Sequence, residues 1–160
     1  SPALSILGNG PGSFRGRKLG VLVCDGVDAG LFVALGRALA AEGAWREVVA
    51  PQVWGVTASD GKHIPAQQQL EGGPSVLYDA VVLLLSPGGV APLLERPAAR
   101  TFVTDAFVHA KFIGYTAAAR PLLVEAGIAG KLDAGCIELS GPDDTADFIA
   151  ACRVLRHWSR

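Results

Sequence analysis

Three short segments of this sequence carry groups that could do chemistry, and each of them follows an apolar run. The segments are Cys24-Asp25-Gly26, Ser86-Pro87-Gly88-Gly89 and Tyr115-Thr116-Ala117. If the apolar runs are strands of one parallel sheet, the segments meet at its carboxyl edge, where open α/β sheets bind their ligands. We therefore expect any site to be a pocket at this edge. Its candidate residues are Asp25, Ser86, Gly88, Gly89, Tyr115 and Thr116.

Two of these segments have a form that acyl-transfer enzymes use. Free backbone N–H groups at Gly88 and Gly89 could stabilise an oxyanion. Thr116 stands at a strand-to-helix junction, where a nucleophile elbow exposes its reactive atom. Such a nucleophile is usually Ser or Cys with a base beside it, and no histidine lies near Thr116 in the sequence. The sequence therefore favours a simpler interpretation, in which residues 86–89 form a turn and Thr116 caps a helix.

The cysteines and histidines show no spacing that is typical of a metal site. They are Cys24, Cys136, Cys152, His63, His109 and His157. Their number and spacing fit neither a zinc site nor a disulfide framework. Cys24 could be a reactive thiol, but the neighbouring Asp25 would raise the pKa of that thiol, and such a cysteine is more often a small buried hydrophobe. We expect no metal and no cofactor in this chain.

The elements that would position these groups alternate between strand and helix. Short apolar runs predict the strands, and Leu31, Leu35 and Leu39 mark the buried stripe of a helix between Asp28 and Gly43. An Asp-Gly pair between β-prone residues predicts a hairpin. The expected strands cover residues 19–24, 47–50, 80–85, 111–115 and 134–139, the helices 28–42, 97–110, 117–126 and 140–157, and the hairpin 53–65.

This alternation predicts an α/β fold with a doubly wound, mostly parallel sheet in three layers and a small β-hairpin insertion. Residues 19–158 would form this domain. Residues 1–18 are rich in glycine and predict a linker. The sequence contains no methionine and begins with Ser1-Pro2, so we interpret it as a part of a longer chain whose preceding domain is missing.

The composition excludes several classes of protein. Half of the 160 residues are hydrophobic and 18% are charged, which excludes a disordered chain. The longest strongly apolar run, Val81–Leu85, is far shorter than the ~20 residues of a membrane span. A net charge of −1 argues against a nucleic-acid partner. Free cysteines favour a reducing, cytoplasmic setting.

Five stretches together resemble a known family. They are GSFRGRKLGVLVCDG (residues 12–26), GVTASDGKHIP (55–65), GGPSVLYDA (72–80), KFIGYTAAA (111–119) and RHWSR (156–160). Their order and spacing are similar to the C-terminal domain of large-subunit haem catalases. That domain resembles flavodoxin and the class I glutamine amidotransferase-like superfamily, which includes the PfpI-type proteases. The resemblance covers essentially the whole chain.

The resemblance implies a catalytically silent domain. Active amidotransferase-like members carry a cysteine at the elbow and an acid on the first helix, and these positions correspond to Thr116 and to the neighbourhood of Leu31. The parent would dismutate hydrogen peroxide at a haem held outside this chain, because neither Tyr78 nor Tyr115 lies in a haem-ligand motif. The parent would be a homotetramer, and the catalase domain of the same polypeptide would be the partner of this one.

Three functions therefore remain open. The first is a non-catalytic domain that supports the stability, folding or assembly of the catalase, with a chaperone-like role included. The second is a PfpI-like hydrolase or glyoxalase-type enzyme that uses Cys24 or Thr116. The third is a flavodoxin-like module that binds a small molecule near Gly88 and Gly89.

Overall fold

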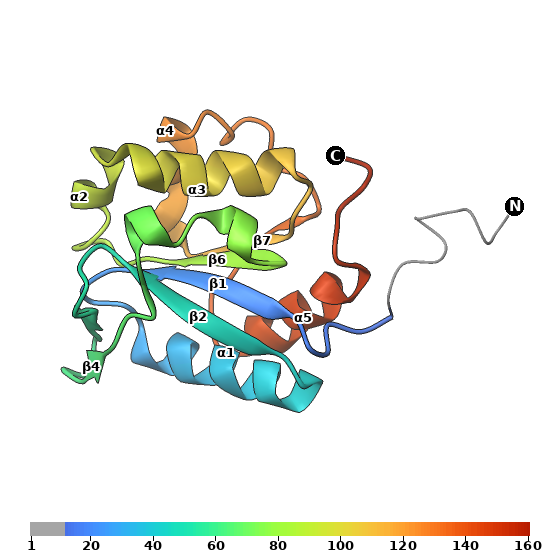
Figure 1. Cartoon of the computed structure of the whole chain (residues 1–160), viewed down its shortest axis with the longest axis horizontal. Helices are drawn as coiled ribbons and strands as arrows, with labels where there is room; N and C mark the ends of the chain where they lie inside the picture. The colour runs from blue at the N-terminus through green and yellow to red at the C-terminus, as the bar shows by residue number, and fades with distance from the viewer. Residues whose placement is uncertain (1–11) are drawn as a thin grey trace, which may run out of the picture.

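The computed structural model describes residues 12–160, which form a six-stranded sheet covered by helices on both faces (Figure 1). In the sheet, the strands follow the order β5-β2-β1-β6-β7-β8, and every neighbouring pair is parallel. The strands are β1 (Lys18–Val23), β2 (Trp45–Ala50), β5 (Gln68–Gln69), β6 (Ala80–Leu84), β7 (Ile113–Tyr115) and β8 (Cys136–Glu138). The prediction of a doubly wound α/β fold is confirmed.

Two helical layers enclose this sheet. The α-helices are α1 (Ala29–Glu42), α2 (Ala91–Leu94), α3 (Pro97–Val108), α4 (Arg120–Glu125) and α5 (Asp144–Ala151). Helices α1 and α5 pack together on one face, and α2, α3 and α4 pack on the other (Figure 1). Short 3₁₀ turns are η2 (Leu70–Gly72), η3 (Ser75–Leu77), η4 (Ala117–Ala119) and η5 (Cys152–Val154). Because both faces are covered, the central strand β6 is apolar throughout, and all five of its residues are buried.

Helix α1 begins and ends where the sequence predicts. The Asp28 carboxylate accepts a hydrogen bond from the Leu31 N–H at 2.9 Å, which caps the first turn. Gly43 ends the helix in the left-handed conformation, with φ of 76°. Leu31, Leu35 and Leu39 are buried against the sheet, as their spacing indicates.

The small hairpin consists of β3 (Val56–Thr57) and β4 (His63–Ile64), which pair antiparallel. Gly61 in the turn has a φ of 84°, a conformation that favours glycine, so the Asp-Gly signal predicted this turn correctly. The hairpin lies beside the carboxyl edge of the sheet, because Gly26 donates a backbone hydrogen bond to Thr57.

Several predicted boundaries were wrong. Helix α3 ends at Val108 because Ala110 takes a positive φ of 59°. The last helix ends at Ala151 and not near His157, because η5 and a positive φ at Leu155 turn the chain. The edge strand β5 and the short helix α2 were missed.

The predicted linker, residues 1–18, lies partly outside the described residues, since these start at residue 12. Within the described part, Phe14 is fully buried in the core beneath α1. Its N–H donates to the Glu42 carboxylate at 3.0 Å. The chain is therefore packed on the domain from Phe14 onward. No helix among the described residues is both long and apolar enough to span a bilayer.

Candidate functional site

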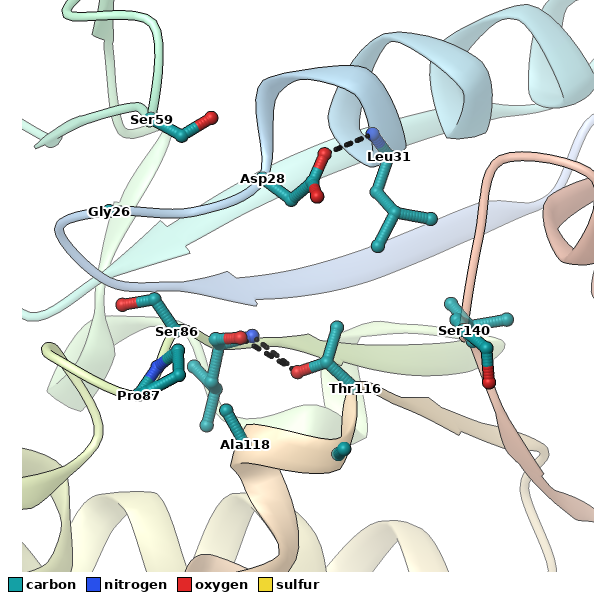
Figure 2. A pocket seen from close by; sticks show the side chains of 12 residues that line it. Gly26, Asp28, Leu31, Ser59, Ser86, Pro87, Thr116, Ala118 and Ser140 are labelled. Carbon is teal, nitrogen blue, oxygen red and sulfur yellow. Dashed lines mark hydrogen bonds between the residues drawn. The ribbon is translucent and has the colours of Figure 1, made fainter.

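A cleft of about 400 Å³ lies at the carboxyl edge of the sheet, between the ends of β1, β6, β7 and β8 (Figure 2). This is the point at which the strand order reverses, where doubly wound sheets bind their ligands. We call it the carboxyl-edge cleft. It is lined by Gly26, Asp28, Leu31, Ser59, Leu85, Ser86, Pro87, Thr116, Ala117, Ala118, Leu139 and Ser140.

Thr116 stands at the position where an elbow nucleophile would be expected, but its hydroxyl is already engaged. The Leu85 N–H donates to Oγ1 of Thr116 at 3.1 Å, and Oγ1 donates to the Leu85 carbonyl at 2.8 Å (Figure 2). With φ of −81° and ψ of 159°, Thr116 has ordinary extended backbone and not the strained geometry of an elbow. The hydroxyl therefore joins the end of β7 to the end of β6.

The same contacts correct the prediction that Thr116 caps a helix. Thr116 directly precedes η4, but its side chain makes no capping hydrogen bond to this turn. The main chain of Leu85, 31 residues away, takes both the donor and the acceptor of the hydroxyl group.

Among the described residues, no histidine lines the carboxyl-edge cleft. His63 bonds to the carbonyl of Trp54, and His109 bonds to the carbonyl of Asp105. His157 lies edge-on to the Phe112 ring. A general base for Thr116 would have to come within hydrogen-bond reach, and none of these imidazoles is placed to do so.

The carboxylate that this cleft contains is also engaged in a structural contact. The resemblance led us to expect the position of the first-helix acid near Leu31, and Leu31 lies buried in the cleft wall. Asp28 brings a carboxylate to the cleft, and that carboxylate caps α1. This carboxylate therefore stabilises the N-terminus of α1, where a negative charge interacts favourably with the helix dipole.

The turn at Ser86 is bound tightly to the loop after β1. The Ser86 N–H donates to Sγ of Cys24 at 3.2 Å, and the Ser86 hydroxyl donates to the Asp25 carbonyl at 2.6 Å. The Gly89 N–H donates back to the Ser86 hydroxyl at 3.1 Å. The Gly89 amide is thus bonded within the turn, so the free oxyanion donor that the glycine pair suggested is not present at Gly89.

Close packing explains the glycine at this position. A Cβ on Gly89 would lie 2.6 Å from the Asp25 carbonyl oxygen and 2.6 Å from Sγ of Cys24, whereas a Cβ on Gly88 would meet open space. Both glycines, with Asp25, face a smaller cleft of about 170 Å³ beside the hairpin. Asp25 also fixes the hairpin, since its carboxylate accepts the Thr57 N–H at 2.9 Å.

The structure thus divides the six predicted residues among three places. Ser86 and Thr116 line the carboxyl-edge cleft, while Asp25, Gly88 and Gly89 line the smaller one. The side chain of Tyr115 packs in the core on the α3 and α4 face, where burial raises the pKa of its phenol. Alternation along β7 places neighbouring residues on opposite faces of the sheet, and this separates Tyr115 from the cleft.

Three polar residues of the cleft were not predicted as site residues: Asp28, which the sequence indicated only as a helix cap, Ser59 and Ser140. The Ser59 hydroxyl accepts the Ala29 N–H at 3.0 Å, and Ser140 follows β8. The position of Ser140 after a predicted strand could have indicated it. Ser59 reaches the cleft through the fold of the hairpin, for which the local sequence carries no signal.

The residues present do not fit a haem. Tyr78 is buried and its hydroxyl donates to the Glu47 carboxylate at 2.9 Å, while burial raises the pKa of this phenol. A haem iron takes tyrosine as the phenolate, which these surroundings disfavour at Tyr78 and at Tyr115. Within residues 12–160, no cluster of three or more His, Cys, Asp or Glu side chains is placed to hold a metal ion.

Known proteins resemble this chain in sequence and in fold. Residues 15–160 match the family described as the C-terminal domain found in long catalases. Catalase C of Rhizobium meliloti is 55% identical over all 160 residues, which make up 23% of that protein. Catalase HPII of Pseudomonas putida is 32% identical over 162 residues, which make up 22% of it. The chain therefore spans less than a quarter of these relatives.

Solved structures place the fold in a wider group. A DJ-1 superfamily protein from Salmonella typhimurium, solved as a mutant, superposes with a TM-score of 0.71 at 23% identity, over 87% of this chain and 90% of that one. Oxidized DJ-1 of Toxoplasma gondii superposes with a TM-score of 0.70 at 16% identity, over 88% and 91%. These structures share the fold, and the sequence relatives define the family. The chain belongs to the C-terminal domains of the long, large-subunit catalases.

Proposed function

We propose that this domain is non-catalytic and contributes to the stability, folding or assembly of the long catalase to which it belongs. The dismutation of hydrogen peroxide would then take place at a haem in the remaining part of the polypeptide. The observation that carries this proposal is the pair of hydrogen bonds between the Thr116 hydroxyl and the Leu85 main chain. Because this hydroxyl both donates to and accepts from the backbone, it acts as a structural group and not as a nucleophile.

The partner and setting follow from the same proposal. The catalase body of the same polypeptide would be the partner, and the assembled protein would be a homotetramer. Cys24, Cys136 and Cys152 are free thiols, which supports a reducing cytoplasm as its location.

The test is deletion of residues 15–160 from the full-length catalase. We expect unchanged peroxide turnover per haem and faster loss of activity on heating, because the body would lose contacts that stabilise it. Unchanged turnover per haem would indicate a structural role of the domain, and reduced turnover would indicate a catalytic one. If the shortened protein survives heating as long as the full-length one and assembles equally well, the proposal is wrong.

A chaperone-like role needs exposed apolar surface on the domain. ANS fluorescence and suppression of client aggregation by the 160-residue chain would test it. An absence of both signals would reject this form of the proposal and leave the stabilising role to the deletion experiment.

The carboxyl-edge cleft favours a second candidate, the binding of a small molecule, because it lies where doubly wound sheets hold their ligands. A screen of nucleotides and flavins for a shift in melting temperature tests this function. The enzyme alternative is tested by methylglyoxal and peptide turnover, with Thr116→Ala and Cys24→Ala as the variants. Loss of a measurable activity in either variant would overturn the non-catalytic proposal.

A further inference from the structure

The opposite edge of the sheet carries another cleft, of about 460 Å³, which the function proposed above does not use. We call it the amino-edge cleft, because Val76 and Lys111 in its lining precede β6 and β7. Its rim is apolar and open: the exposed fractions are 62% for Val76, 76% for Val108 and 49% for Trp158. Exposed apolar side chains that gather around one hollow are typical of a contact surface.

The floor of this cleft is cationic. Lys111 is only 3% exposed, and its ammonium donates to the main-chain carbonyl of Ser75 at 2.7 Å. Arg156, half-buried beside it, donates to the carbonyls of Asp79 and Leu155. Among the described residues, no carboxylate lies within 4.0 Å of either cation.

Two carboxylates act on Lys111 from a greater distance. Asp79 and Asp105 favour its charged form, whereas burial and the charge of Arg156 lower the pKa of the ammonium. The Asp79 carboxylate is itself bound to the Lys18 N–H at 3.0 Å and lies 3.9 Å from the Arg17 guanidinium. The described residues that line the cleft thus include two cationic side chains and no carboxylate, and a carboxylate from outside could pair with these cations.

The amino-edge cleft lies close to the point where the chain enters the domain, at the start of β1. Asp79 joins the two, because it binds Lys18 at the start of β1 and its carbonyl accepts a hydrogen bond from Arg156. Figure 1 shows that the start of β1, the end of α3 and the C-terminal residues lie at the same side of the molecule. In long catalases this domain is C-terminal, so the catalase body precedes β1 in the sequence, and the cleft lies on the side of the domain where β1 begins.

We propose that the amino-edge cleft docks on the catalase body of the same polypeptide. The docking surface of the body would present an apolar side chain with a carboxylate beside it. The apolar group fits between Val76, Val108 and Trp158, and the carboxylate pairs with Arg156 above the buried charge of Lys111. This inference rests on the proposed function, because it needs a catalase body as the partner.

Hydroxyl-radical labelling of the full-length catalase tests the docking. Trp158 and Trp54 have similar exposed fractions in this domain, 49% and 55%, but Trp54 lies beside the hairpin at the carboxyl edge. If the amino-edge cleft is docked, Trp158 is labelled several-fold less than Trp54. Equal labelling of the two indoles would overturn the proposal.

A matched pair of variants checks the cause of the protection. Val108→Lys places a charge in the cleft rim and should raise the labelling of Trp158 to the level of Trp54. Val53→Lys places the same charge on a residue of similar exposure, 72% against 76%, outside the cleft, and should change nothing. Protection of Trp158 that survives in Val108→Lys would contradict the proposal.

A photo-crosslinking amino acid at position 158 identifies the occupant. A crosslink to the catalase body supports the proposal, and a crosslink to a second copy of residues 12–160 overturns it. The deletion experiment remains independent of this result. A crosslink to the body together with unchanged heat resistance on deletion would leave the docking in place and reject the stabilising role.

Discussion

The hydroxyl of Thr116 and the main chain of Leu85 form a reciprocal pair of hydrogen bonds across the ends of β7 and β6. The Thr116 N–H also donates to the Leu83 carbonyl at 3.1 Å, so both the main chain and the side chain of Thr116 bind the end of β6. The Thr116 side chain, which the sequence offered as a candidate nucleophile, is here part of the framework of the sheet.

Loss of the Thr116 hydroxyl should therefore destabilise the domain. Thr116→Val keeps the shape but leaves the buried Leu85 N–H without its partner, which costs about 1–3 kcal/mol. Thr116→Ser should retain most of the stability. Urea unfolding measures the difference, and Thr101→Val on the exposed face of α3 is the control. Equal stability of Thr116→Val and the parent would show that the hydroxyl is dispensable.

Adjacent glycines in the turn after β6 should respond differently to alanine. Gly89→Ala brings a Cβ to 2.6 Å from the Asp25 carbonyl oxygen, so the backbone has to shift, with an expected cost of about 1–3 kcal/mol. Gly88→Ala meets open space and should stay within about 0.5 kcal/mol of the parent. Thermal and urea unfolding of the two variants would reveal this contrast, and similar losses in both would refute the packing explanation.

Gly20 should be intolerant of any side chain because the Tyr78 ring lies on it. A Cβ at Gly20 would fall 2.2 Å from Cδ2 of Tyr78, and moving the ring would break its hydrogen bond to Glu47. We expect Gly20→Ala to lose about 1–3 kcal/mol. A double-mutant cycle with Tyr78→Ala measures the coupling. If the two losses simply add, the ring is not the cause.

Acid should weaken the attachment of the C-terminal residues. Arg160 donates to both oxygens of Asp133, at 2.6 and 2.9 Å, and lowers the pKa of that carboxyl from its ordinary value of 3.8 to about 2. Because the folded pKa is depressed, the stabilisation is complete above the unfolded value and is lost as the pH falls from about 4 to about 2.

We expect this loss to be on the order of 1–2 kcal/mol. Unfolding of Asp133→Asn should depend less on pH in that range than unfolding of the parent. Asp143→Asn is the control, since Asp143 is exposed and its side chain makes no capping hydrogen bond. An Asp133→Asn profile as steep as that of the parent would contradict the assignment.

The features that could be predicted from the sequence are those that depend on interactions between residues close together in the chain. Helix α1 begins after Asp28 and ends at Gly43 through interactions within one turn of the helix. The Asp-Gly pair at residues 60–61 suits its turn because Gly61 adopts a positive φ. Edge strand β5 was missed because its two glutamines carry no apolar pattern, and it exists through its pairing with Val49 and Ala50.

The candidate site was predicted less well, since its arrangement depends on distant contacts. The sequence correctly brought Ser86 and Thr116 to one edge of the sheet. It could not show that Thr116 binds Leu85 rather than the next helix, because the two partners are 31 residues apart. Nor could it show that Gly89 is bonded to Ser86 and packed on Cys24, as only the folded chain brings those strand ends together.

Cys24 and Cys152 are buried and Cys136 is partly buried, which has a consequence for their reactivity in a domain of the long-catalase family. Oxidation by peroxide proceeds through the thiolate, and burial raises the pKa of Cys24, Cys136 and Cys152 above that of a free cysteine. The chain also contains no methionine, the other sulfur-containing residue, which oxidants convert to a sulfoxide. At neutral pH the sulfur atoms of this domain are thus held in the form that hydrogen peroxide attacks least.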